Sequence, residues 1–458
     1  MPGRLSPVGA GFNLVNTIVG SGILALPYAL REAGFYAGLA AMAAVAALSY
    51  AALTLLIYSG RRSGLDRFDA ASGAALGRAG RGLLAFALLV NSVGSCVSYL
   101  IIVGDTGAVV AQQALGARLL TSRAAVMALA AVGCTLPLLF FRTLEPLVRP
   151  SVASTACLPL IVAIVAVRGP AYRDRAPPGG PGPGPVPVPA PGPVPTPVLG
   201  PSVLPAVGVI AFAYSCTQTA FQSYQTLRAK TLRAWRRAAG LANGLALAIY
   251  LAFSVAGYRA FGLRTEPNVL NNFARDDALA NVARALLAFS LTLTYPMQFY
   301  PIRDLLADAL GLAPPPPPHS PPHHRARFCA LTVALFAATL AAALAIDDLG
   351  FVFKLIGTAA SSLLLFGLPG AIYLCLASPY HPSAPKSSSS SPSSSAESAS
   401  PLLLPPPPAA PASSDDCSSD RSDIAEPLTS LVAVLLLMVG AAVFAIGTWT
   451  SVREHIRA

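Results

Sequence analysis

Charged residues are scarce in this sequence. Asp, Glu, Lys and Arg together make up 11% of the 458 residues, whereas hydrophobic residues make up 54%, and the mean hydropathy is +0.61. Soluble globular domains carry about 25% charged residues, so much of this chain's surface must face lipid rather than water. The composition excludes an ordinary soluble domain and indicates an integral membrane protein.

Catalytic and metal-binding signatures are also missing. The seven cysteines include no C-x-x-C pair, and the five histidines show no metal-ligand spacing, which argues against a disulfide framework and a zinc site. The sequence contains no H-E-x-x-H, P-loop, G-x-S-x-G or kinase motif. We therefore predict that the protein is not an enzyme and holds no cofactor.

Eleven apolar segments are long enough to cross a bilayer, for which a helix needs about 20 residues. We expect an all-α membrane protein with 11 transmembrane helices. With approximate ends, the predicted spans cover residues 8–30, 34–58, 82–112, 124–141, 148–167, 202–226, 238–261, 278–301, 327–346, 350–376 and 428–450.

Basic residues concentrate in short segments between the spans. They are dense between Arg61 and Arg81 and between Arg228 and Arg237, which favours a cytoplasmic N-terminus because cytoplasmic loops carry an excess of Lys and Arg. No aromatic and basic face accompanies the net charge of +11, so we expect no nucleic-acid partner.

Proline- and serine-rich stretches divide the spans into groups of five, five and one. Low-complexity sequence of this kind cannot build a packed core. An odd group of five spans that repeats must be inverted the second time, as in many secondary transporters. The predicted divisions are a first five-helix repeat at 8–167, a Pro/Gly-rich outer loop at 168–201, a second repeat at 202–376, a Ser/Pro-rich cytoplasmic loop at 377–427 and the eleventh span at 428–450.

The first span contains residues that weaken a helix near its middle. Gly20 and Gly22 loosen the backbone, and Pro27 removes one helical hydrogen bond. Unwound backbone survives in a bilayer only where it lines a cavity or is buried in protein. The freed N–H groups of Ser21, Gly22 and Ile23 would suit a carboxylate. The alternative is that these small residues serve close helix packing.

Spans 6 and 8 carry uncharged polar residues at mid-span. Tyr214, Cys216 and Thr217 in span 6 favour a cavity wall for a substrate without a charged side chain. In span 8, the residue pair Thr292 and Thr294 precedes Pro296, and hydroxyl and freed carbonyl oxygens there could coordinate a hard cation such as sodium. The alternative for span 8 is threonines that hydrogen-bond back to their own helix.

Ionisable residues within the spans are rare. Asp105 in span 3 is the clearest of them, and an intramembrane carboxylate suggests a proton carrier or a cation partner. Its alternative interpretation is an exposed or ion-paired group near the outer interface. We expect Lys354 and Arg284, which lie close to span ends, to extend to the interface without a role in transport.

Several segments resemble the amino acid/auxin permease superfamily, and within it the sodium-coupled neutral amino acid transporters. The similar segments are Phe12–Gly34, Ser98–Asp105, Asn268–Phe273, 291–303 and Lys354–Leu374. The resemblance implies an inverted 5+5 repeat of the LeuT-like type plus one extra helix. The outer loop after span 5 departs from many animal members, since it has neither a cysteine nor an N-glycosylation sequon.

The same resemblance implies roles for particular residues. Sodium would be bound by the side chain of Asn16, by a backbone carbonyl, for which Val19 is the candidate, and by either Thr292 or Thr294. Ser21, which follows the first glycine of the break, would contact the substrate.

Together these observations predict a monomeric secondary active transporter of small neutral amino acids that works by alternating access and is coupled to Na⁺. One alternative is a proton-coupled vacuolar or lysosomal exporter that uses Asp105. Another is a membrane amino acid sensor that binds but hardly transports. We expect a multi-pass protein of the plasma membrane or of a vacuolar or lysosomal membrane.

Overall fold

The computed structural model describes residues 5–115, 122–140, 145–172, 196–311, 322–376 and 426–457. Within these ranges the regular secondary structure is helical, apart from one isolated parallel bridge between Leu5 and Leu227. Most of the predicted outer loop at 168–201 and of the predicted cytoplasmic loop at 377–427 lies outside the described residues.

The helices follow the order of the predicted spans. In the first half they are α1 (Pro7–Ile18), the 3₁₀ turn η1 (Ser21–Ala25), α2 (Leu26–Ala33), α3 (Phe35–Ser63), α4 (Phe68–Leu115), α5 (Arg123–Ala130), η2 (Ala131–Thr135), α6 (Leu136–Leu139), α7 (Glu145–Arg168) and η3 (Gly169–Tyr172).

The second half begins at the predicted sixth span. Its elements are α8 (Val203–Ala213), η4 (Thr217–Thr219), α9 (Ala220–Gln225), α10 (Leu232–Phe261), η5 (Gly262–Arg264), η6 (Val269–Asn272), α11 (Ala278–Ala309), α12 (Pro322–Ala345), α13 (Leu349–Leu355), the π-helical turns η7 (Ile356–Ser361) and η8 (Leu363–Gly367), α14 (Leu368–Leu376), α16 (Glu426–Ala442), η9 (Val443–Gly447) and α17 (Thr448–Arg457).

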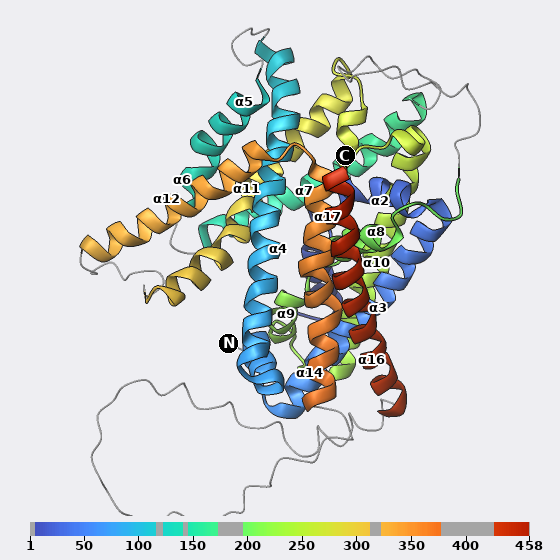
Figure 1. The fold of residues 1–458 in the computed structure, drawn as a ribbon, viewed down its shortest axis with the longest axis vertical. Coiled ribbons are helices and arrows are strands. Elements are labelled where there is room, and N and C mark those ends of the chain that lie inside the picture. The colour runs from blue at the N-terminus through green and yellow to red at the C-terminus, as the bar shows by residue number, and fades with distance from the viewer. Residues whose placement is uncertain are drawn as a thin grey trace, which may run out of the picture.

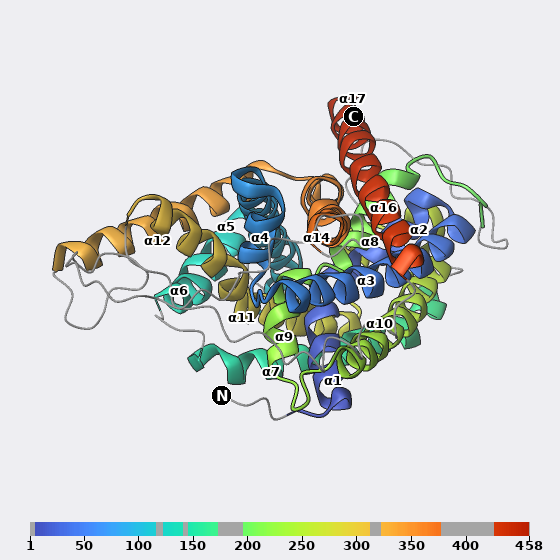
Figure 2. The ribbon, with the colours of Figure 1, turned by 90° about the horizontal axis from the view of Figure 1, so that it is seen from below.

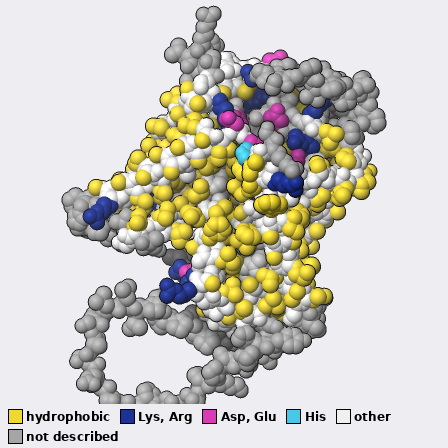
Figure 3. Space-filling model, viewed as in Figure 1, with side chains coloured by type: hydrophobic (Ala, Val, Ile, Leu, Met, Phe, Trp, Pro, Cys, Tyr) yellow, Lys and Arg dark blue, Asp and Glu magenta, His cyan; other side chains and the backbone are white. Residues whose placement is uncertain are grey.

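Eight helices in the described ranges are long and apolar enough to cross a membrane, or nine if the bent pair α1 and α2 is one span. Two shorter apolar helices, Arg123–Leu139 and Cys157–Tyr172, occupy the places of predicted spans 4 and 5. Hydrophobic side chains cover most of the face shown in Figure 3, and charged side chains gather towards its ends. An all-helical membrane protein is therefore confirmed, whereas the count of eleven spans and the inverted repeat stay predictions.

A short helical segment precedes the third span. Helix α4 begins at Phe68, before the predicted start at 82, but it is not continuous: Gly77 (φ 62°, ψ −142°) is not helical and kinks the backbone between two helical segments. A positive φ of this kind favours glycine. Arg78 and Arg81 lie just after the kink, within the predicted basic segment.

Two helix groups make up the bundle. Helix α1 packs on α10, and α2 packs on both α8 and α10, whereas α11 packs mainly on α4 and α7. Figure 2 shows α3 and α10 side by side, and Figures 1 and 2 show the C-terminal helices α16 and α17 on the outside of the bundle, with α17 at the end that carries the C-terminus. The broken first span is therefore held between the helices of spans 2, 6 and 7.

The expectation that Arg284 and Lys354 extend to the interface is wrong. The exposed fraction is 1% for Arg284 and 8% for Lys354. Arg284 stays charged inside the protein because it donates hydrogen bonds to the carbonyl oxygens of Leu270 (2.8 Å) and Phe273 (2.7 Å). Burial of a charge is tolerated where such partners are present.

Candidate functional site

The first span breaks where the sequence predicts. Helix α1 ends at Ile18, and α2 resumes the helix at an angle of 59°. Val19 (ψ 82°) and Gly20 (φ −112°, ψ −155°) are not helical. The N–H of Ile23 donates to the carbonyl of Gly20 at 3.4 Å, so the amides of Ser21 and Gly22 are the better candidates for binding a carboxylate.

The sixth span is interrupted as well, although its sequence contains no glycine or proline at that point. Helix α8 ends at Ala213, residues 214–216 are not helical, and the chain continues through the short turn η4 into α9. The hydroxyl of Thr219 donates to the carbonyl of Cys216 at 2.8 Å. Hydroxyl groups at mid-span thus take hydrogen bonds that the helix backbone would otherwise make.

The two interruptions are in direct contact. A Cβ atom on Gly22 would lie 2.8 Å from the Cα of Ala213, so only glycine fits at this approach. The buried hydroxyl of Tyr250, on α10, lies 2.7 Å from the carbonyl oxygen of Ile18 and 2.8 Å from that of Ala213. Tyr250 can therefore donate to the last carbonyl of either broken helix. Sequence reasoning missed this residue, because a single tyrosine in an apolar helix gives no signal.

Polar atoms without a partner lie along the interruption of span 6. Among the described residues, the hydroxyls of Tyr214 and Ser215 and the amide oxygen of Gln218 are buried and make no hydrogen bond. Buried polar groups in proteins are nearly always paired, so these atoms are candidates for contact with a substrate. The ring of Tyr214 packs edge-on against that of Tyr250, with centroids 5.0 Å apart.

The other two predicted contacts in span 6 are placed differently. The hydroxyl of Thr217 donates to the carbonyl of Leu364 at 2.8 Å and so joins span 6 to span 10. Cys216 is fully buried in the core. Ser215 and Gln218, which flank these two residues, carry the unpaired atoms instead.

The predicted sodium ligands lie on two spans. Asn16 is exposed on the side of α1 that does not pack on α10, and Val19 is buried. The hydroxyls of Thr292 and Thr294 donate to the carbonyls of Ala288 (2.8 Å) and Ser290 (2.9 Å). In the described part of the chain no hydrogen bond joins Asn16 to these threonines, so the sodium site stays a prediction. A back-bonded hydroxyl keeps its lone pairs and can still coordinate a cation.

Asp105 forms an ion pair near one end of the bundle. Its carboxylate lies 2.5 Å from Arg123 Nε, and Arg123 also contacts Asp347 at 2.6 Å. The side chain of Asp105 is 19% exposed and that of Asp347 is 89% exposed. The ion pair agrees with the alternative interpretation of Asp105, and its role in coupling stays a prediction.

A buried charge cluster, which the sequence did not reveal, lies on the C-terminal side of the first break. Lys354 on α13 contacts Glu32 on α2 at 2.5 Å and Glu454 on α17 at 2.9 Å. Glu454 also accepts a hydrogen bond from Ser202, at the start of α8. We call these four residues the Lys354 cluster. It connects both broken helices to the helices of spans 10 and 11.

Two carboxylates in the loops outside the spans have shifted pKa values. Burial raises the pKa of Glu266, and the charge of Asp105 acts in the same direction, while Asn271 and Arg31 act against it. Burial also opposes ionisation of Asp277, but hydrogen bonds from Arg168, Tyr172 and a backbone N–H outweigh it and hold the pKa of Asp277 below its usual value.

Curated relatives of this chain are transporters. A rat protein provisionally named sodium-coupled neutral amino acid transporter 11 is 30% identical over 82% of this chain and 79% of that protein. Rat sodium-coupled neutral amino acid transporter 7 is 27% identical over 82% and 79% of the two chains. Vacuolar amino acid transporter 2 of Saccharomyces cerevisiae is 24% identical over 81% and 76%.

A solved structure and a family model complete the comparison. The structure, a Na⁺-coupled sialic acid symporter in a substrate-bound outward-open state, aligns with a TM-score of 0.49 and 13% identity over 82% of this chain and 79% of that one. The family model matches residues 3–388, which is most of the sequence. Its members are transporters and not enzymes. The chain therefore belongs to the family described as transmembrane amino acid transporter protein.

Proposed function

We propose that this protein is a secondary active transporter of small neutral amino acids, coupled to Na⁺ and working by alternating access. The contact between the two interrupted helices, at Gly22 and Ala213, carries this proposal. Membrane transporters commonly bind substrate where discontinuous helices meet near the bilayer midplane.

The contact offers one group that suits the carboxylate of an amino acid and another that suits its ammonium group. The amides of Ser21 and Gly22 start the helix that runs through η1 and α2, and this positive end suits the carboxylate. The C-terminal ends of α1 and α8, at Ile18 and Ala213, are negative dipole ends and suit the ammonium group. A zwitterion is therefore complementary to the site.

The surrounding side chains favour a neutral substrate. Tyr214, Ser215 and Gln218 present unpaired polar atoms without formal charge, and Cys216 is a small apolar neighbour. A substrate with a charged side chain would lose its hydration there without gaining an opposite charge.

Sodium coupling follows from thermodynamic linkage. An ion held by Asn16, the carbonyl of Val19 and a threonine of span 8 would stabilise the unwound segment that receives the carboxylate. Each ligand would then raise the affinity for the other by the same factor. Support comes from the relatives named as sodium-coupled transporters.

Proton coupling at a vacuolar or lysosomal membrane is the second candidate. The pairing of Asp105 with Arg123 at 2.5 Å and the similarity to a yeast vacuolar transporter favour it. In this alternative, protonation of the Asp105 carboxylate would remove its ion pair with Arg123 and leave Arg123 paired with Asp347 alone. A cytoplasmic N-terminus and a monomeric state are part of both proposals.

One flux experiment separates these candidates. The full-length protein is reconstituted into liposomes, and uptake of radiolabelled neutral amino acids is measured with sodium or with choline, at two pH values. Uptake that requires sodium supports the main proposal, and uptake that follows the pH gradient supports the second. Binding of an amino acid without flux would contradict both and favour a sensor.

A further inference from the structure

Four spans depart from the regular α-helix part-way along their length. Spans 1 and 6 are not helical at residues 19–20 and 214–216. Span 10 changes to the π-helical turns η7 and η8 between α13 and α14, and span 11 changes to the π-helical turn η9 between α16 and α17. A π-helical turn weakens the hydrogen-bond ladder and is a common place for a helix to bend. Each of these spans therefore consists of two half-helices joined by a segment that can bend.

Contacts between neighbouring spans place the four interruptions at one level of the bundle. The breaks of spans 1 and 6 touch each other. The hydroxyl of Thr217, just after the break of span 6, donates to the carbonyl of Leu364 in η8 at 2.8 Å. A Cβ on Gly447 in η9 would lie 2.8 Å from the Cγ2 of Thr358 in η7. Spans 1, 6, 10 and 11 can therefore bend together at this level.

The Lys354 cluster joins the four half-helices on one side of this level. Glu32 lies on α2, Ser202 caps the start of α8, Lys354 lies on α13 and Glu454 lies on α17. In Figure 1, α2, α8 and α17 lie towards the end of the bundle that carries the C-terminus, whereas α9, α14 and α16 lie towards the opposite end. Separating the half-helices would leave buried charges without partners, which is costly.

Helix α17 is attached to α13 by further contacts. The rings of Phe351 on α13 and His455 on α17 stack with centroids 4.0 Å apart and an interplanar angle of 14°. At the other end of α17, the hydroxyl of Thr448 donates to that of Thr358 at 3.2 Å. The half-helix of span 11 is thus bound to the half-helix of span 10 at both of its ends.

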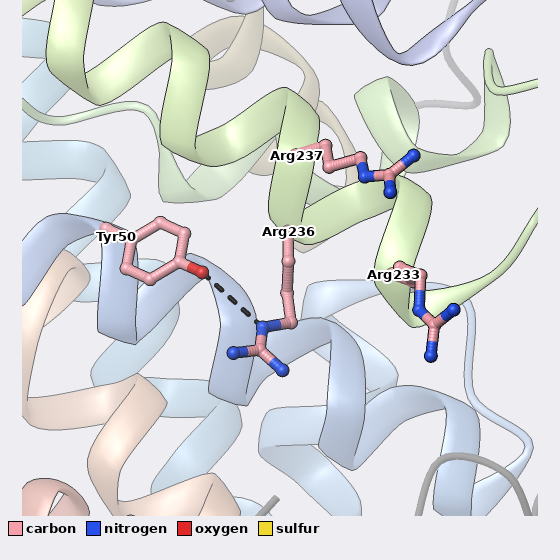
Figure 4. Close-up of a pocket in the computed structure, with 4 residues that line it drawn as sticks. All are labelled: Tyr50, Arg233, Arg236 and Arg237. Atoms are coloured by element: carbon pink, nitrogen blue, oxygen red, sulfur yellow. Dashed lines mark hydrogen bonds between the residues drawn. The ribbon is translucent and has the colours of Figure 1, made fainter. Parts of the chain in front are cut away.

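Helices α3 and α10, by contrast, form a continuous frame beside the interrupted spans. They run without interruption over 29 and 30 residues. The indole Nε1 of Trp235 on α10 donates to the carbonyl of Leu53 on α3 at 3.0 Å. Figure 4 shows Arg236 of α10 extending towards Tyr50 of α3, with Nε 3.4 Å from the hydroxyl. Two uninterrupted helices held in this way resist bending, so motion is expected in the interrupted spans.

We propose that α2, α8, α13 and α17 tilt as one body during transport, with the four interruptions as hinges. The last span, which lies outside the predicted 5+5 repeat, is therefore part of the moving body. The reason is geometric: if span 11 stayed fixed while span 10 tilted, the contacts of Glu454 and His455 with α13 would break. Transporters commonly change access by hinged motion of one helix group against another. This inference rests on the alternating-access transport proposed above.

The test compares two cysteine pairs at the same end of the bundle. F351C/H455C joins α13 to α17 within the proposed body. R123C/D347C joins the residue before the cap of α13 to α5, which Asp105 ties to α4. The wild-type side chains of the second pair are 2.6 Å apart, so both pairs are within reach of a short bis-methanethiosulfonate reagent. All native cysteines except the buried ones at positions 96, 157 and 216 are replaced by serine.

Uptake of a mixture of radiolabelled alanine, serine and glutamine is measured in liposomes before crosslinking, after it and after reduction. We expect the crosslink in F351C/H455C to leave uptake unchanged. The crosslink in R123C/D347C should stop uptake, because it ties the moving body to span 4, and reduction should restore it. Loss of uptake on crosslinking F351C/H455C, or full uptake after crosslinking R123C/D347C, would overturn the proposal.

The rate of crosslinking gives a second readout that does not depend on uptake by the variants. The thiols that remain free are counted by labelling with maleimide-polyethylene glycol. Sodium together with the amino acid mixture should change the rate several-fold in R123C/D347C and leave it unchanged in F351C/H455C, and equal changes in the two pairs would overturn the proposal. Absence of uptake by the uncrosslinked wild type would instead contradict the proposed function, so the two failures are distinguishable.

Discussion

Lys354 Nζ lies 2.5 Å from Glu32 Oε2, in a contact that joins span 10 to the second half of span 1. Both side chains are about one-tenth exposed, and Glu454 of the last helix completes the pairing at 2.9 Å. Two carboxylates thus share one ammonium inside the protein. Since breaking a buried ion pair leaves an uncompensated charge, this contact should hold the surrounding helices together.

Removing the lysine should therefore destabilise the protein. We expect Lys354→Met to cost about 3–5 kcal/mol, the usual range for a buried pair that loses one partner. Glu454→Gln should cost much less, since the Glu454 side chain is 41% exposed. Thermal melting in detergent measures both. The double variant E32Q/K354M should recover part of the loss, and the absence of any recovery would show that the two residues are not coupled.

The lowered pKa of Asp277 predicts how acid affects the fold. A carboxyl group whose folded pKa lies below its unfolded value, about 3.9 for Asp, stabilises the protein above that value and loses this effect as the pH falls through the folded pKa. Arg168 and Tyr172 are the partners that lower it. We expect Asp277→Asn to lower the melting temperature at neutral pH and to matter less below about pH 4. A constant difference at all pH values would contradict this assignment.

The sequence allowed the break in span 1 to be predicted, because Gly20, Gly22 and Pro27 each weaken a helix through the local backbone. The interruption of span 6 was less evident, since residues 214–216 contain neither glycine nor proline. Its cause is tertiary: Tyr250, distant in sequence, lies within hydrogen-bond distance of the carbonyl of Ala213.

Charged residues gave the least reliable predictions from sequence. Lys354 and Arg284 look like interfacial residues when their positions near span ends are considered alone. Their actual partners, Glu32 and the carbonyls of Leu270 and Phe273, become visible only when distant segments are brought together. Hydropathy locates the spans, whereas pairing between charges depends on which faces of those spans meet.

Tyr250→Phe tests the connection between the two broken helices. The change removes one hydroxyl and leaves the carbonyls of Ile18 and Ala213 without that donor, which costs about 1–3 kcal/mol for a buried acceptor. We expect slower maximal transport together with a lower melting temperature. Tyr36→Phe, at a residue 55% exposed, is the control. Unchanged transport in Tyr250→Phe would show that the bridge does not matter for function.

Four substitutions identify the coupling ion. If sodium binds as proposed, Thr292→Ala and Asn16→Ala should raise the sodium concentration for half-maximal uptake by about tenfold or more, as expected when about 1.4 kcal/mol of ligand interaction is lost. Thr292→Ser keeps the hydroxyl and should resemble the wild type. Asp105→Asn should leave sodium dependence unchanged but abolish any dependence on pH. Normal transport by Asn16→Ala at low sodium would show that the sodium site is elsewhere.

Gly22 and Gly20 form a matched pair for testing the substrate site itself. A Cβ on Gly22 would lie 2.8 Å from the Cα and 3.1 Å from the Cβ of Ala213, whereas one on Gly20 meets nothing within 4 Å. Because backbone atoms of α8 cannot move aside as a side chain could, Gly22→Ala should push the two interrupted helices apart. Gly20 has an extended conformation (φ −112°) that alanine adopts without strain.

We therefore expect Gly22→Ala to reduce uptake at least about tenfold, which corresponds to a misfit of about 1.4 kcal/mol, while Gly20→Ala keeps most of it. Uptake is measured in liposomes after size-exclusion chromatography has shown that both variants are folded. Since both glycines lie in the same unwound segment, a general loss of backbone flexibility would affect the two variants alike. Equal losses would mean that the segment needs freedom to move, and not that its contact with Ala213 shapes the site.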